Sequence, residues 1–117
     1  MQEEIEAWDY WDTNVLSFNI LYFGDEVSVV WEENDYGVEL LFTGCSSLSY
    51  VTSPEDRVKP IKELTRPQLP YFLHDIKVTD IERRGIDLFK LKITMPPLFI
   101  DMICTDITIR KIDSGIC

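Results

Sequence analysis

Residues 15–43 read VLSFNILYFGDEVSVVWEENDYGVELLFT, and the spacing of their apolar residues decides the fold. Hydrophobic side chains recur at every second position in three short runs, which is the period of a strand with one buried face. We therefore predict three antiparallel strands that form a meander with one shared apolar face. The predicted inward rows are Leu16, Phe18, Ile20 and Tyr22, then Val27, Val29 and Trp31, then Val38, Leu40 and Phe42.

Two short connections separate the three runs. Phe23-Gly24-Asp25-Glu26 is a turn sequence, because Gly accepts positive φ and Asp bonds its own backbone. Residues 33–37, ENDYG, have the Asn, Asp and Gly content of a three-to-five-residue hairpin loop. Both connections are short enough to keep consecutive strands side by side.

Further strands are predicted after the meander. Residues 47–52 alternate as a fourth strand, and a second set covers residues 71–83, 86–93 and 99–112. A change of phase before Ile81 predicts a bulge or bend, and the long last run places Ile103, Thr105, Ile107 and Ile109 on one face. About seven short strands with regularly spaced turns predict an all-β chain with little helix. An antiparallel β-sandwich and a strongly coiled barrel both fit this pattern.

The length of 117 residues predicts a single domain, residues 1–117, with two irregular parts. Residues 1–14 form a lead-in segment, either a short helix with Ile5, Trp8 and Trp11 on one side or an extended stretch. Its tryptophans either cap the core or stand exposed on a binding surface. Residues 53–70 form a connector between the two strand sets, because Pro60 and Pro67 cut short any helix that begins there.

The charges are distributed unevenly along the chain, whose net charge is −10. Residues 1–56 contain 13 acidic groups and no Lys or Arg, whereas residues 57–117 contain 8 acidic groups and all 11 basic ones. The two halves therefore carry −13 and +3. Such an acidic surface disfavours nucleic acid and anionic membrane as partners and favours a basic protein.

The termini and the cysteines point to a cytoplasmic chain. No apolar run approaches the roughly 18 residues of a membrane span, and the start MQEEIEAWDY is acidic where a signal peptide needs Lys or Arg. The three cysteines make an odd count without a CxxC pair, which argues against a disulfide framework or a zinc site. Cys45 and Cys104 are expected to be small buried hydrophobes, and Cys117 a tail thiol.

No catalytic signature is present. The sequence lacks GxSxG, P-loop and HExxH motifs, and it contains one histidine, His74. We expect His74 to be a partly exposed residue at the start of a strand, not a catalytic base. Residues 33–37 offer oxygen ligands without the spacing of an EF-hand, so a solvated loop is favoured over a calcium site. The prediction is a non-enzyme without cofactor or metal.

Four stretches of the chain resemble a group of small acidic proteins of Bacillus-type bacteria. They are NILYFGDEVSVV at residues 19–30, LFTGC at 41–45, QLPYFLHDI at 68–76 and CTDITI at 104–109. Many proteins of this group are encoded downstream of polymorphic, contact-dependent toxins and are taken to be their immunity proteins. The resemblance implies an immunity protein with a toxin domain as its partner, and it carries no catalytic residues to transfer.

The sequence thus predicts a protein that binds and occludes a basic toxin domain, a nuclease being one candidate, through its acidic half. The alternative is a non-catalytic adaptor or structural module that binds another protein. Residues on hairpin loops and outward strand faces are the expected contacts, with Tyr36 as an aromatic anchor among charges. The predicted partner-binding residues are Asp25, Glu26, Glu32, Glu33, Asp35, Tyr36 and Glu39.

Overall fold

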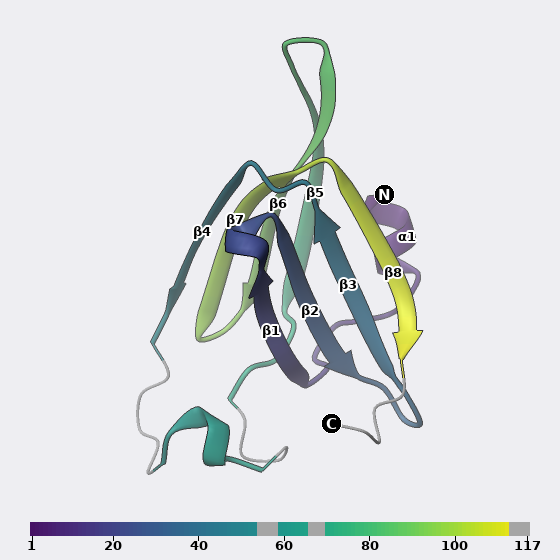
Figure 1. Cartoon of the computed structure of the whole chain (residues 1–117). Helices are drawn as coiled ribbons and strands as arrows, with labels where there is room; N and C mark the ends of the chain where they lie inside the picture. The colour runs from purple at the N-terminus through teal and green to yellow at the C-terminus, as the bar shows by residue number, and fades with distance from the viewer. Residues whose placement is uncertain (54–58, 66–69, 113–117) are drawn as a thin grey trace.

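The computed structural model of the chain describes residues 1–53, 59–65 and 70–112. Its eight strands form two four-stranded antiparallel sheets, ordered β1-β2-β3-β8 and β4-β7-β6-β5 (Figure 1). The two sheets stay separate and do not close into a barrel. The predicted all-β fold with little helix is confirmed in its sandwich form.

The first sheet contains the predicted meander. β1 (Val15–Leu21), β2 (Glu26–Glu32) and β3 (Gly37–Thr43) lie side by side in sequence order, and β8 (Asp106–Ile112) adds to the far edge of β3. The register places Val29 beside Leu40, and Leu40 beside Ile109. The period-two alternation of residues 26–43 therefore predicted the inner face of β2 and β3 correctly.

The second sheet is built from β4 (Ser47–Thr52), β7 (Leu98–Cys104), β6 (Ile86–Met95) and β5 (Asp75–Arg83). Ile76, Ile93 and Ile100 are neighbours across this sheet, and all three are buried. Lys77 and Lys92 are neighbours on its other face and are exposed. The inner face is thus apolar, as predicted, and the outer face carries basic side chains.

The chain crosses between the sheets at two adjacent places, residues 43–47 and 104–106. At the first, Gly44 has a φ of +63°, and a Cβ there would overlap the Thr105 hydroxyl. At the second, the Thr105 backbone N–H and hydroxyl both donate hydrogen bonds to the Thr43 carbonyl oxygen, at 3.1 and 3.0 Å. The two crossings therefore fix each other.

This second crossing corrects the prediction of one long last strand. Thr105 lies outside both strands, so residues 98–112 form β7 in one sheet and β8 in the other. In β7 the inward residues are Ile100, Met102 and Cys104, not Ile103 and Thr105. Apolar residues of both parities occur here, so the alternation did not identify the inner face.

The core lies between the two sheets. Its fully buried members include Trp31, Phe42, Leu40, Leu91 and Ile93. The predicted inward row of β1 is wrong in part, because Phe18 is only half-buried, Ile20 is 39% exposed, and Tyr22 is 72% exposed and lies outside the strand. β1 and β4 are both edge strands, so this side of the sandwich is incompletely covered.

The lead-in segment combines a short helix with an irregular stretch. α1 (Gln2–Glu6) lies beside β5, where the Gln2 side-chain amide pairs with the strand edge. Its Nε2 donates to the Ile76 carbonyl oxygen at 2.7 Å, and its Oε1 accepts the Val78 N–H at 2.6 Å. The Tyr10 hydroxyl accepts the Ile76 N–H at 2.9 Å, so the edge of β5 is covered.

The tryptophans of this segment divide between the two alternatives. Trp8 packs partly against the core, whereas Trp11 is exposed and stacks on the buried Tyr10 ring with centroids 4.4 Å apart.

The remaining short elements are two 3-10 turns, η1 (Tyr22–Gly24) and η2 (Ile61–Glu63). η2 lies in the connector, where Ile61 and Leu64 are half-buried. Residues 54–58 and 66–69 of the predicted connector lie outside the described residues. Among the described residues, no helix is long and apolar enough to cross a membrane.

The β5–β6 hairpin extends beyond the sandwich as a two-stranded arm, at the top of Figure 1. Pairing of β6 with β7 starts at Phe89, so residues 81–88 pair only within the hairpin. Arg84 and Gly85 form its turn with φ of +55° and +78°, as predicted. Of the bulge or bend predicted before Ile81, the bulge is wrong, since β5 and β6 pair without a shift. The apolar phase changes there because the arm has no core to face.

Candidate interaction surface

The predicted partner-binding residues do not form one patch. Asp25 and Glu26 lie where β2 begins, and residues 32–36 lie where β2 ends. The six-residue rise along β2 separates the two groups by about 20 Å. Glu39 lies between them on the outer face of β3, across from Arg110. The structure therefore offers two acidic ends, and each has its own surroundings.

The end formed by residues 32–36 is tied to the body of the protein. The buried Trp31 indole N–H donates to Glu33 Oε1 at 3.0 Å, and the Glu33 backbone N–H donates to the Tyr36 carbonyl oxygen at 2.8 Å. The Tyr36 ring packs partly against the core, and the Lys111 ammonium lies 4.6 Å from the ring centroid. The expected anchor Tyr36 is thus half-buried and covered on one side by a cation.

Glu39 has partners within the first sheet. Arg110 Nε donates to its Oε1 at 2.7 Å, and the Ser28 hydroxyl donates to its Oε2 at 2.9 Å. The Glu39 side chain is only 14% exposed. Its charge is therefore balanced locally, and its role in this structure is to join β2, β3 and β8.

The opposite end presents aromatic side chains to solvent. η1 connects β1 to β2, and its residues Tyr22, Phe23 and Gly24 have positive φ values of 50°, 60° and 98°. The left-handed region costs a non-glycine residue roughly 1–2 kcal/mol. Phe23 is nevertheless fully exposed and Tyr22 is 72% exposed, so neither ring gains burial in return. Sequence reasoning identified this turn through Gly24-Asp25 but missed the exposed rings.

A shallow groove of about 400 Å³ extends from η1 toward the start of β4. It is lined by apolar Ile20 and Leu48, by residues of η1, and by Asp25 and Cys45. The Cys45 N–H donates to the Asp25 carbonyl oxygen at 2.9 Å, which holds the two connections together. We call the set Ile20, Tyr22, Phe23, Asp25, Glu26 and Leu48 the η1 surface. It combines exposed apolar groups with carboxylates.

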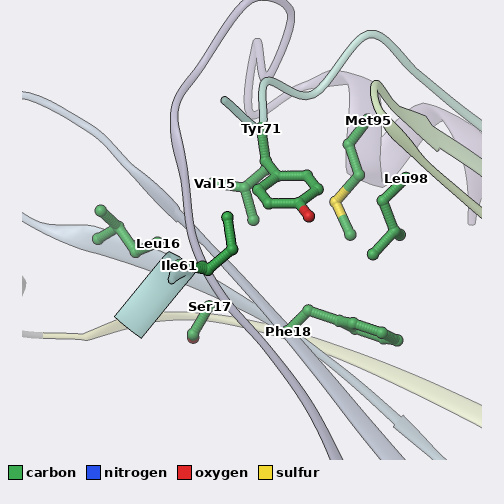
Figure 2. Close-up of a pocket in the computed structure, with 8 residues that line it drawn as sticks. All are labelled: Val15, Leu16, Ser17, Phe18, Ile61, Tyr71, Met95 and Leu98. Atoms are coloured by element: carbon green, nitrogen blue, oxygen red, sulfur yellow. The ribbon is translucent and has the colours of Figure 1, made fainter. Parts of the chain in front are cut away.

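A second cavity, of about 200 Å³, lies lower on the same side of the sandwich. Figure 2 shows Tyr71, Met95 and Leu98 at one side of it and Leu16, Ser17 and Ile61 at the other. Val15 and Phe18 complete its lining. The cavity is apolar and offers few polar groups that could orient a ligand, so we assign it no chemistry.

His74, Cys45 and Cys104 are side chains of the kind that serves as a base or a nucleophile. His74 is exposed before β5, and its backbone N–H donates to the Thr94 carbonyl oxygen at 2.8 Å. Burial, reinforced by the neighbouring Cys45, raises the pKa of Cys104 to about 12. Burial and then Asp25 and Glu26 also raise the pKa of the half-buried Cys45. Both thiols are therefore protonated at neutral pH. Cys117 lies outside the described residues.

Within the described ranges, no group of three or more His, Cys, Asp or Glu side chains lies close enough to hold a metal ion. The loop at residues 33–37 instead uses Glu33 for the hydrogen bond to Trp31.

Comparison with known families identifies the chain. A family model described as immunity protein PIM7 matches residues 1–111. The chain belongs to this immunity protein family. The match extends from α1 through β7 and most of β8, so it covers both sheets, both acidic ends and the arm. A comparison with curated proteins finds no match.

Membership of the PIM7 family confirms the resemblance to immunity proteins that the sequence showed. Immunity proteins are generally non-catalytic, and their family implies a protein partner, the toxin. The two acidic ends and the exposed rings of η1 are the features that a partner protein could contact.

Proposed function

We propose that this immunity protein binds a cognate bacterial toxin domain in the cytoplasm and blocks it by occlusion. The observation that carries the proposal is the family match over residues 1–111. Occlusion requires one bound copy for each toxin molecule and no turnover. The protein would then act in proportion to its amount.

The charge of the first sheet supports a basic toxin domain as the partner. On its four strands the only basic residues are Arg110 and Lys111, and these contact Glu39 and the Tyr36 ring. The outer face carries Glu26, Glu32 and Asp106 in addition to Glu39. A nuclease fits this surface, because the Lys and Arg that hold its phosphates would meet carboxylates.

The test uses the protein encoded immediately upstream of this chain as the probe. We expect it to stop growth when expressed alone and to be neutralised by the chain at a molar ratio close to one. A His74→Gln variant serves as a control, and we expect it to protect as well as the wild type. Protection at far lower ratios would indicate enzymatic inactivation instead. Failure to bind or protect would favour the adaptor alternative.

The acidic mechanism is tested by a salt series on the same complex. Rim charges chiefly accelerate association, so replacing Glu32, Glu33 and Asp35 by Gln or Asn should slow association and flatten its salt dependence. Gln at position 33 retains an oxygen for the Trp31 indole, which keeps the loop intact. An association rate that ignores both salt and these substitutions would contradict electrostatic steering.

A further inference from the structure

We propose that the η1 surface is the anchor of the toxin interface, with the Phe23 ring entering an apolar pocket whose rim is basic. This inference rests on the proposed function and adds the position of the contact and the chemistry of the partner. It favours the end that carries Asp25 and Glu26 over the end formed by residues 32–36.

Phe23 and Tyr22 are both exposed on η1. Neither ring contributes to the core, and both residues adopt backbone conformations that Asn or Gly would adopt more readily. Stability of the isolated chain does not explain aromatic residues at these positions. Exposed aromatic rings on a fixed turn are the residue type that most often dominates a protein interface.

Apolar side chains also lie beside the two rings. Ile20 and Leu48 line the groove that adjoins η1, and the half-buried Phe18 contacts Tyr50 edge to face, with centroids 5.3 Å apart. The edge strands β1 and β4 lie on the same side of the sandwich. Among the described residues, no other element covers the exposed Ile20 and Tyr50 on these two strands. A partner that binds the Phe23 ring can therefore extend into this groove, where Ile20 and Leu48 offer apolar contacts and Ser46 and Ser47 offer hydroxyls.

The negative charge of the η1 surface selects the chemistry of the partner. Asp25 is exposed beside Phe23, and Glu26, Thr43 and Asp106 follow one another across β2, β3 and β8. No basic residue lies on the described β1, β2 or η1. A second copy would bring the same carboxylates against these and would be repelled, as would any acidic partner. A basic surface around an apolar pocket complements the η1 surface.

The test measures binding of the upstream-encoded protein to the full chain and to a Phe23→Asn variant. Asn tolerates positive φ, so the variant should unfold at the same or a higher urea concentration than the wild type. Loss of a central aromatic anchor should nevertheless weaken binding and raise the dissociation constant by about 30-fold or more. A Phe99→Thr variant is the matched control, because it removes a half-exposed ring from the outer face of β7.

A second pair of variants separates the two acidic ends. Asp25→Asn with Glu26→Gln should slow association by about tenfold at low salt. Glu32→Gln with Asp35→Asn should have the smaller effect. A larger effect of the Glu32 and Asp35 pair, or an unchanged affinity in Phe23→Asn, would overturn the proposed position of the anchor. Protection by the wild-type chain would still support the proposed function in that case.

Two further outcomes complete the experiment. If the wild-type chain neither binds nor protects, the proposed function fails and this inference fails with it. A second copy of the chain is the alternative occupant of the η1 surface, and light scattering on the purified chain tests for it. A wild-type dimer that Phe23→Asn converts to a monomer would assign the η1 surface to self-association and overturn the toxin assignment.

Discussion

Trp31 shows how a single residue connects the predicted binding loop to the core. Its side chain is fully buried, its ring meets Tyr10 edge to face, and its indole N–H is bonded to Glu33. Glu33 therefore stabilises the fold through this hydrogen bond and also contributes a charge at the surface. A substitution at position 33 must preserve an acceptor before any loss of binding can be assigned to charge.

We expect Trp31→Ala to lower the free energy of unfolding by about 3–5 kcal/mol, because a large enclosed ring leaves a cavity. Urea unfolding followed by circular dichroism measures this. Trp11→Ala is the control, since Trp11 is exposed and should cost about 1 kcal/mol or less. Equal losses in the two variants would contradict the enclosed position of Trp31.

The buried Cys104 thiol makes the free energy of unfolding depend on pH in the alkaline range. Its pKa rises from 9.0 to about 12 on folding, so the folded chain keeps a proton that the unfolded chain releases. The stabilisation is complete below pH 9 and is lost as the pH rises toward 12. We expect the free energy of unfolding to fall across this window by up to about 1.4 kcal/mol per pH unit from this thiol.

Urea titrations between pH 7 and pH 11 measure that slope. Tyr10, whose pKa burial also raises, contributes in the same direction and is present in every variant. Cys104→Ala should therefore reduce the slope without abolishing it. A slope identical to that of the wild type would show that Cys104 does not titrate as described.

At the scale of elements, the two edge strands of the second sheet differ in whether another segment covers them. β5 is covered by the lead-in segment, through the Gln2 amide and the Tyr10 hydroxyl. β4 pairs only with β7 and is mostly exposed. An uncovered edge invites pairing with another chain, so the lead-in segment keeps the second sheet from extending through β5.

Gln2→Ala tests this covering role. It removes both hydrogen bonds to the edge of β5, and we expect a loss of about 1–3 kcal/mol together with increased self-association. Gln2→Glu should fall between Ala and the wild type, because a carboxylate accepts the Val78 N–H but cannot donate to the Ile76 carbonyl oxygen. Glu3→Ala, at an exposed neighbour, is the control. Urea unfolding and light scattering that fail to separate Gln2→Ala from this control would contradict the assignment.

The elements also show what alternation can and cannot predict. It identified β2 and β3 because their inner faces meet a complete opposing sheet. It placed Ile20 inward in β1 but could not show that the facing strand, β4, is also an edge. It misread residues 99–112 because Ile103 and Met102 are both apolar, so parity did not reveal the crossing at Thr105.

At the scale of the whole molecule, the charge split of the sequence shows only in part on the outer faces of the two sheets. The outer face of the first sheet carries Glu26, Glu32, Glu39 and Asp106 with Arg110, while that of the second carries Lys77, Lys90 and Lys92 together with Asp75 and Asp101. Composition predicted the acidic surface but not its division into two ends. The exposed rings of η1 could not be predicted, because their exposure follows from backbone angles that composition does not encode.

The sequence of the β5–β6 arm is only weakly constrained by the packing of the core. Its residues 81–88 pair only with one another, and their side chains are exposed or half-buried. Insertions, deletions or exchanges near Arg84 and Gly85 would leave the contacts between the two sheets intact. New surface chemistry could therefore accumulate there one substitution at a time, while the core that specifies the sandwich stays the same.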